Sequence, residues 1–169
     1  MLNIFVEGPA DERFFMKIYG KYFGDFRIIK YAGWSPSKIN KFIYSISCMP
    51  DNDYFFFGDA DGKTIDEKKS ILINRYSNLD HDKVFIVQYE IESWYYAGIS
   101  MEVCQNLKLK QYIHNTDGLT KEDFNAKLPR KVDRKIVMAQ LLDVYELALA
   151  ISRNTSLSLF DASIEKESA

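Results

Sequence analysis

The sequence predicts an α/β fold, in which a mainly parallel sheet of about four strands has helices on both faces and continues into a helical C-terminal extension. Short apolar runs alternate with segments of helical periodicity through residues 1–100, and this alternation is typical of parallel sheets. The content of 47% hydrophobic and 27% charged residues is that of an ordered globular protein. A chain of 169 residues is long enough to bury a sizeable core.

Four apolar runs have the length and composition of buried strands. They are Leu2–Val6, Arg27–Tyr31, Asp53–Phe57 and Lys83–Gln88. Glycine, proline or acidic residues follow most of these runs, and such residues favour turns at strand ends. Since the intervening segments have helical patterns, we expect right-handed crossover connections.

The expected helices are marked by apolar residues that recur at helical spacing. They cover Ala10–Phe23, Ser35–Ile46, Ile65–Tyr76, Ser93–Gly98 and Asp133–Ile151. Thr120 and Asp123 resemble a capping box and predict a further helix start.

No internal repeat, low-complexity tract or clear linker divides the chain. We therefore expect residues 1–160 to form a single Rossmann-like α/β domain that includes the helical C-terminal part. Residues 161–169 are polar and terminal, and we expect them to form a flexible tail.

The formal net charge of −2 gives no overall basic footprint for nucleic acid. The segment 108–135 differs, because it holds eight Lys/Arg against four Asp/Glu and is therefore +4. Its cluster of Arg130, Lys131, Arg134 and Lys135, together with Lys63, would guide nucleic acid toward a site. A solvated helical face explains the same residues equally well.

The remaining composition favours a reducing cytoplasm. Cys48 and Cys104 lack the spacing and the nearby histidines of a zinc site or disulfide framework. The N-terminus becomes acidic too early for a signal peptide, and no apolar run has membrane-spanning length. His81 and His114 have no acidic or nucleophilic pattern around them that would suggest catalysis.

Acidic residues follow three of the four expected strands. Glu7 follows the first, Asp59 and Asp61 the third, and Glu90 and Glu92 the fourth. Ligands of open parallel sheets bind beyond the carboxyl ends of the strands. Carboxylates crowded at one edge would raise one another's pKa, and a divalent cation removes this conflict. Oxygen ligands without His or Cys suit Mg²⁺ or Mn²⁺ rather than zinc, so we expect such a site.

The spacing of these acids supports a shared target. Alternate residues of an extended segment point the same way, so Asp59 and Asp61 are expected to face one metal, as are Glu90 and Glu92. Simpler interpretations remain open, since Asp-x-Asp-Gly is also a common turn. Acids are also common at helix starts, which would account for Glu90 and Glu92.

The strand-Glu7-Gly8 and strand-Asp59-Ala60-Asp61-Gly62 segments resemble the motif pair of Toprim domains. The segments Val6–Phe15, Glu90–Ala97 (with an E-x-E-x-W pattern) and Ser156–Phe160 are similar to a group of small standalone Toprim-like proteins, the DUF4276 group, related to nucleases of the overcoming-lysogenization-defect type. The similarity touches most of the chain. The motif pair alone is common, and its combination with the E-x-E-x-W segment is more specific.

The resemblance implies a Mg²⁺- or Mn²⁺-dependent nuclease, or a related phosphoryl-transfer enzyme acting on nucleic acid. Glu7 would be a general acid/base or metal ligand, Asp59 and Asp61 would hold the metal, and Glu90 and Glu92 would complete a site for one or two ions. The resemblance also implies a defence or nucleic-acid-processing system with an ATPase partner protein. Whether the substrate is DNA or RNA stays open.

Two other functions fit the residues. A non-catalytic partner-binding module would retain the fold with a vestigial site. A haloacid-dehalogenase-like phosphatase would use Asp59 as a nucleophile, although its motif normally follows the first strand. The aromatic residues Trp94, Tyr95 and Tyr96 would either stack on bases or belong to the core.

Overall fold

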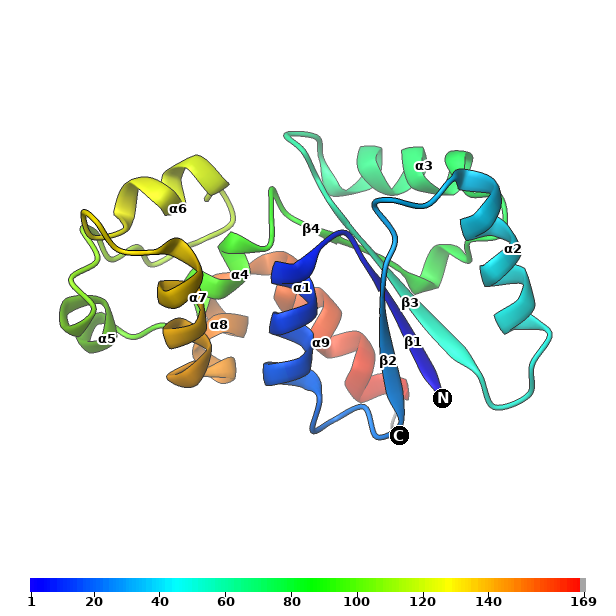
Figure 1. The fold of residues 1–169 in the computed structure, drawn as a ribbon, viewed down its shortest axis with the longest axis horizontal. Coiled ribbons are helices and arrows are strands. Elements are labelled where there is room, and N and C mark those ends of the chain that lie inside the picture. Colours follow the sequence, from blue (N-terminus) through cyan, green and yellow to red (C-terminus); the bar gives the residue numbers. More distant parts are fainter. Residues whose placement is uncertain (168–169) are drawn as a thin grey trace. The chain divides into compact units, whose positions relative to one another are not determined.

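A computed structural model describes residues 1–167 of the chain, with side chains to residue 164. Its sheet confirms the predicted fold class: four strands, all parallel, in the order β2-β1-β3-β4 (Figure 1). The strands are β1 (Leu2–Val6), β2 (Phe26–Lys30), β3 (Asp53–Asp59) and β4 (Val84–Val87).

The described chain divides into two compact units, Met1–Val87 and the part that begins at Gln88. The first unit contains the whole sheet and the helices α1 (Pro9–Phe14), α2 (Pro36–Ser47) and α3 (Ile65–Arg75). It also contains a π-helical turn, η1 (Phe15–Tyr19), and a 3₁₀ turn, η2 (His81–Lys83). The second unit is helical throughout its regular elements: α4 (Glu92–Ala97), α5 (Met101–Asn106), α6 (Lys121–Lys127), α7 (Arg134–Asp143), α8 (Leu147–Arg153) and α9 (Thr155–Glu167).

Alternate residues of the strands bury on opposite faces of the sheet, as a two-residue period requires. Phe5 and Phe56 stack at 5.6 Å and pack with α2 and α3 on one face. Phe57 packs on the other face against Phe15 of η1, with ring centroids 4.5 Å apart. Both faces of this sheet are therefore covered by helices of the first unit, which explains its continuous apolar strands.

The second unit is built around α4. Every residue from Ile91 to Ile99 is buried, so the carbonyl groups at the end of this helix need protein partners. The Tyr145 hydroxyl donates to the Trp94 carbonyl at 2.7 Å, and the Glu146 N–H donates to the Gly98 carbonyl at 2.8 Å. Arg153 donates to the carbonyls of Ala97 (2.8 Å) and Ile99 (2.6 Å).

Three helix boundaries differ from those expected. The helix predicted over Ala10–Phe23 ends at Tyr19 after the π-helical turn, which buries Phe15, Ile18 and Tyr19. The helix predicted over Asp133–Ile151 breaks into α7 and α8, because Tyr145 and Glu146 leave the helix to bond with the end of α4. At the C-terminus, α9 continues past Phe160 to Glu167.

The expected tail falls partly outside the described residues, which end at 167. In residues 1–167, no helix has the length and apolar character needed to cross a membrane.

Candidate functional site

The carboxyl edge of the sheet contains a point where the strand order reverses. From β1 the chain crosses to β2 on one side, and from β3 it crosses to β4 on the other side (Figure 1). Ligands of open α/β sheets bind at such a point. Glu7 directly follows β1, and Asp59 is the last residue of β3. An acidic residue therefore stands at the end of each of the two adjacent central strands.

Glu7 reaches across to the end of β3. Its Oε1 accepts a hydrogen bond from the Asp59 backbone N–H at 3.1 Å, and both residues are half-buried. Gly58 makes room for Leu72 of α3, whose Cδ1 would lie 2.8 Å from a Cβ at this position, whereas Glu7 Oε1 would lie at an ordinary contact distance of 3.7 Å. The expected convergence of the first and third strand ends is thus present for this pair.

The Tyr31 hydroxyl contacts the Glu7 carboxylate. This buried hydroxyl donates to the Phe57 carbonyl at 2.8 Å and lies 3.3 Å from Glu7 Oε1. Burial raises the pKa of Tyr31 well above its ordinary value, and the negative charges of Glu7 and Asp59 raise the pKa further. Tyr31 therefore stays a neutral hydrogen-bond donor at the site.

Asp61 does not follow the expected geometry. In an extended segment Asp59 and Asp61 would point the same way, but Asp61 has φ of 51° and stands in a turn. Its side chain is 55% exposed and forms an ion pair with Lys68 of α3. The assumption was wrong because Asp61 and Gly62 both adopt left-handed backbone conformations, which redirect the chain into α3.

Glu90 and Glu92 also depart from the extended geometry assumed for them. Tyr89 has φ of 61°, an unusual conformation for a bulky residue, and Glu92 already begins α4. Glu90 accepts a hydrogen bond from the Lys121 N–H at 2.7 Å at the start of α6. Glu92 is 4% exposed and forms an ion pair with Arg134 of α7. Both acids thus have protein partners within the second unit.

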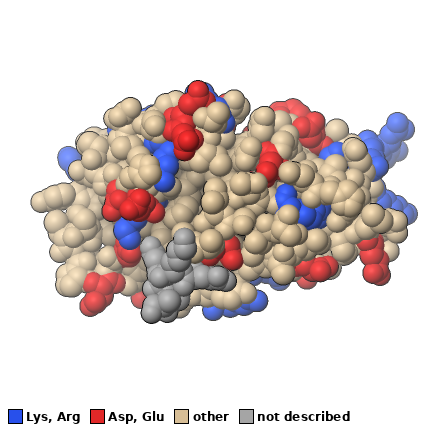
Figure 2. All heavy atoms as spheres, turned by 180° about the vertical axis from the view of Figure 1, so that it is seen from behind, with Lys and Arg blue, Asp and Glu red and all other residues tan. Residues whose placement is uncertain are grey.

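The predicted basic residues are used in different ways. Arg134 pairs with Glu92, and its guanidinium lies 5.7 Å from the centre of the Phe124 ring. Arg130, Lys131 and Lys135 are exposed. Figure 2 shows one face of the molecule, on which acidic and basic groups are scattered among other residues rather than gathered by sign.

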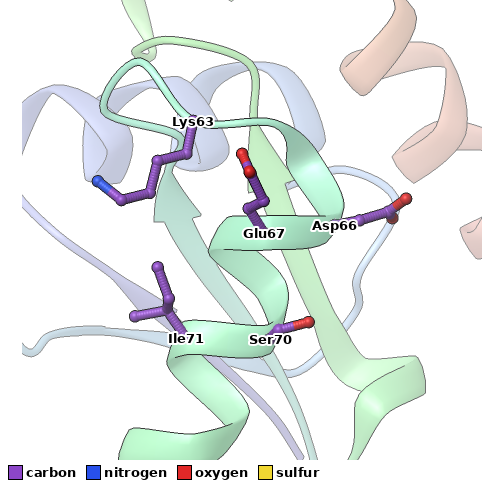
Figure 3. Close-up of a pocket in the computed structure, with 5 residues that line it drawn as sticks. All are labelled: Lys63, Asp66, Glu67, Ser70 and Ile71. Atoms are coloured by element: carbon purple, nitrogen blue, oxygen red, sulfur yellow. The ribbon is translucent and has the colours of Figure 1, made fainter.

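Lys63 is exposed and lines a pocket of about 500 Å³ with residues of the first two turns of α3 (Figure 3). Those residues are Asp66, Glu67, Ser70 and Ile71. Glu67 is engaged in capping the helix, because its carboxylate accepts from the Thr64 N–H at 2.9 Å and from the Thr64 hydroxyl at 3.0 Å. Glu67 therefore does not add to the Glu7–Asp59 pair.

The aromatic segment after Glu92 belongs to the core. Trp94, Tyr95 and Tyr96 have no exposed surface. Trp94 stacks on Phe160, and its ring N–H donates to Ser156 Oγ at 2.8 Å. The core interpretation of these residues is thus confirmed, because no ring face is left for a base.

Only some of the predicted acidic ligands are suited to hold a metal ion. Among residues 1–164, whose side chains are described, no group of three or more His, Cys, Asp and Glu side chains is arranged to hold an ion. Glu7 and Asp59 provide the hard oxygen donors that Mg²⁺ and Mn²⁺ prefer, from two adjacent strand ends. Asp61 lies two residues further along but is neutralised by Lys68. The residues thus fit a cation held chiefly by two carboxylates, with water completing the coordination as is usual for Mg²⁺.

No known protein family, curated protein or solved structure matches this chain.

Two residues of this edge were missed in the sequence. Tyr31 ends an expected strand, and its contact with Glu7 depends on the pairing of β1 with β2 (Val6 with Lys30). Lys68 lies seven residues after Asp61, so the turn and first helical turn bring the two together. A lysine soon after an acidic turn is a signal that could have suggested this ion pair.

Proposed function

We propose that the chain is a Mg²⁺- or Mn²⁺-dependent phosphodiester hydrolase acting on nucleic acid, with Glu7 and Asp59 as its central site residues. One observation carries the proposal. Glu7 Oε1 accepts a hydrogen bond from the Asp59 backbone N–H at 3.1 Å, at the point where the strand order of the parallel sheet reverses. The resemblance of the surrounding segments to Toprim nucleases supplies the reaction class.

Each residue has a role that follows from its contacts. Asp59 N–H and Tyr31 OH hold the Glu7 carboxylate in one orientation, facing the end of β3. In the proposal, Glu7 and Asp59 hold the cation, and Glu7 accepts a proton from the attacking water. A cation bound there supplies charge stabilisation for the phosphoryl oxygens and acidifies a bound water. Asp61 is held beside the site by its ion pair with Lys68 in the first turn of α3.

The proposal places the protein in the cytoplasm with an ATPase partner protein. Cys48 and Cys104 are both unpaired, which suits a reducing cytoplasm. The ATPase partner protein is proposed only because of the resemblance to the Toprim-like group.

A non-catalytic partner-binding module is the second candidate, and a specific observation favours it. Among the predicted metal ligands, Asp61 is paired with Lys68 and Glu92 with Arg134, while Glu90 accepts a hydrogen bond from the Lys121 N–H. Such neutralisation reduces the need for a cation.

The test is a cleavage assay on plasmid DNA, single-stranded DNA and RNA while Mg²⁺ or Mn²⁺ is titrated. Asp59→Asn removes a proposed ligand, and Asp25→Asn is its matched control. Asp25 directly precedes β2, so it lies at the opposite edge of the sheet, and it is exposed. We expect metal-dependent cleavage by the wild type and by Asp25→Asn, and a loss of at least a hundredfold in Asp59→Asn.

Two other outcomes of this assay would support a different function. Metal-dependent hydrolysis of small phosphate esters with a trapped phospho-Asp59 would support the phosphatase instead. Absence of cleavage together with absence of metal binding would favour the partner-binding module.

A further inference from the structure

The edge strand β2 and the outer face of α2 form a basic surface that no acidic residue of the segment interrupts. Residues 26–50 contain Arg27, Lys30, Lys38 and Lys41 but no Asp or Glu, so the segment is +4 while the rest of the chain is −6. Lys30 pairs with Glu12 of α1 at 2.5 Å. The other three cations define what we call the α2 surface.

A pocket of about 450 Å³ lies on the flank of α2 within this surface. Its lining contains two lysines, three serines and one aromatic ring: Ser35, Ser37, Lys38, Lys41, Phe42 and Ser45. Ammonium and hydroxyl groups without a carboxylate among them suit an anionic ligand such as a phosphate.

Two of the three cations of the α2 surface, Lys38 and Arg27, lie over aromatic rings. Lys38 Nζ lies 3.8 Å from the centre of the Trp34 ring, and the Arg27 guanidinium lies 5.2 Å from that of Phe42. Trp34 and Phe42 contact each other edge to face at 5.5 Å. Cations held over aromatic faces lose less freedom when they bind a ligand.

Tyr44 adds an exposed aromatic ring beside the lysines. It lies on the stripe of α2 that carries Ser37 and Lys41, at helical spacings of four and three residues. Its exposed fraction is 62%, whereas Ile39 and Ile43 on the opposite side of the helix are fully buried. An exposed ring next to cations is the arrangement with which proteins stack single-stranded bases.

The α2 surface begins close to the Glu7–Asp59 pair. Trp34 N–H donates to the Tyr31 carbonyl at 2.8 Å, and the Tyr31 hydroxyl contacts Glu7. Because helices of a parallel sheet run opposite to its strands, the start of α2 lies toward the carboxyl edge.

We propose that the α2 surface binds single-stranded nucleic acid, with phosphates on Lys38, Lys41 and Arg27 and a base stacked on Tyr44. This inference rests on the proposed function, because it names the substrate class that the Glu7–Asp59 edge receives. A duplex is excluded as the preferred ligand, since its bases are stacked on each other and offer no free face to Tyr44.

The test measures binding of fluorescein-labelled oligothymidylate and oligouridylate by fluorescence anisotropy in EDTA, at several salt concentrations. The double variant Lys38→Glu/Lys41→Glu is compared with Lys108→Glu/Lys110→Glu, which makes the same charge change on exposed lysines of the second unit. Tyr44→Ala is compared with Tyr44→Phe, which keeps the ring. Circular dichroism checks that each variant is folded.

We expect Lys38→Glu/Lys41→Glu to weaken binding at least tenfold. The slope of log affinity against log salt should fall by about 1.4, since each phosphate contact of a single strand contributes about 0.7. Lys108→Glu/Lys110→Glu should bind within about twofold of the wild type. Tyr44→Ala should lose about tenfold in affinity with an unchanged salt slope, and Tyr44→Phe should bind as the wild type.

Three results would overturn the inference: no binding of either oligonucleotide, loss of binding only in Lys108→Glu/Lys110→Glu, or tighter binding of a duplex that is insensitive to Tyr44→Ala. Binding through α2 without cleavage in any metal ion would uphold the inference and defeat the nuclease proposal. If Lys38→Glu/Lys41→Glu cleaves and binds nucleic acid with wild-type rate and affinity, the nuclease proposal stands and the inference about the α2 surface fails.

Discussion

Tyr31 is the residue on which the geometry of the Glu7 carboxylate depends. Its hydroxyl lies between Glu7 Oε1 (3.3 Å) and the Phe57 carbonyl (2.8 Å), and it is buried. A neutral donor suits this position, because an ionised Tyr31 would repel Glu7 and Asp59. The sheet thus fixes the Glu7 carboxylate beside a neutral group, which in the proposed site would not compete for the cation.

Substitution Tyr31→Phe should affect both the stability of the fold and the affinity of the proposed site for Mn²⁺. Loss of a buried hydrogen bond should lower the free energy of unfolding by about 1 kcal/mol. Loss of the donor that orients Glu7 should weaken Mn²⁺ binding about tenfold, as for other residues that orient metal ligands. Urea denaturation and calorimetric titration measure the two effects. Tyr44→Phe is the control, because the Tyr44 side chain is 62% exposed; equal behaviour of both variants would contradict the role of Tyr31.

Helix α4 shows how a buried element obtains partners for its end. Its carbonyl groups are bonded by the Tyr145 hydroxyl, the Glu146 N–H and the Arg153 guanidinium. The Tyr145 ring packs directly on the backbone of Gly98, where a Cβ would lie 2.3 Å from the ring. Gly98 is therefore required by packing.

Gly98→Ala tests this packing at the level of the element. The added methyl group must displace the Tyr145 ring and its bond to Trp94, so we expect a loss of about 2 kcal/mol in the free energy of unfolding. Gly118→Ala is the matched control, since a Cβ at Gly118 has no atom within 4 Å. Chemical denaturation of both variants provides the comparison. A Gly98→Ala protein as stable as Gly118→Ala would show that the ring is not held there.

At the scale of the whole molecule, buried tyrosines link stability to alkaline pH. Burial raises the pKa values of Tyr31, Tyr96 and Tyr145 above their ordinary value of 10.0. In the unfolded chain these groups ionise near pH 10, while in the folded chain they remain neutral. Their contribution to stability is therefore fully present below pH 10 and is lost as the pH rises above it.

The free energy of unfolding should accordingly fall between about pH 10 and pH 12, by about 1.4 kcal/mol per pH unit for each such tyrosine. Denaturant midpoints measured across this range provide the test. Tyr31→Phe should show a shallower slope than the wild type. A flat profile above pH 10 would contradict the burial of these hydroxyl groups.

The sheet could be predicted from the sequence because buried parallel strands leave continuous apolar runs. The first strand was predicted with its observed bounds, Leu2–Val6, and the others within two residues at each end. The break between α7 and α8 could not be predicted, because it depends on the contact of Tyr145 with Gly98, 47 positions earlier in the chain.

The candidate site was predictable only in part, for a similar reason. Parallel topology alone brings Glu7 next to Asp59. The directions of Asp61 and Glu92 depend on left-handed residues in the preceding turns and on Lys68 and Arg134, which no local pattern assigns to them.

Direct titration of Mn²⁺ into the protein tests the central claim, that Glu7 and Asp59 at the reversal point of the sheet form a divalent-cation site. Calorimetry or the electron paramagnetic resonance signal of free Mn²⁺ measures the affinity without any assumption about the substrate. We predict that the wild type and Asp25→Asn bind Mn²⁺ alike, and that Glu7→Gln and Asp59→Asn each lose at least tenfold in affinity. Equal Mn²⁺ affinity in all four proteins, or no binding by the wild type, would contradict the claim.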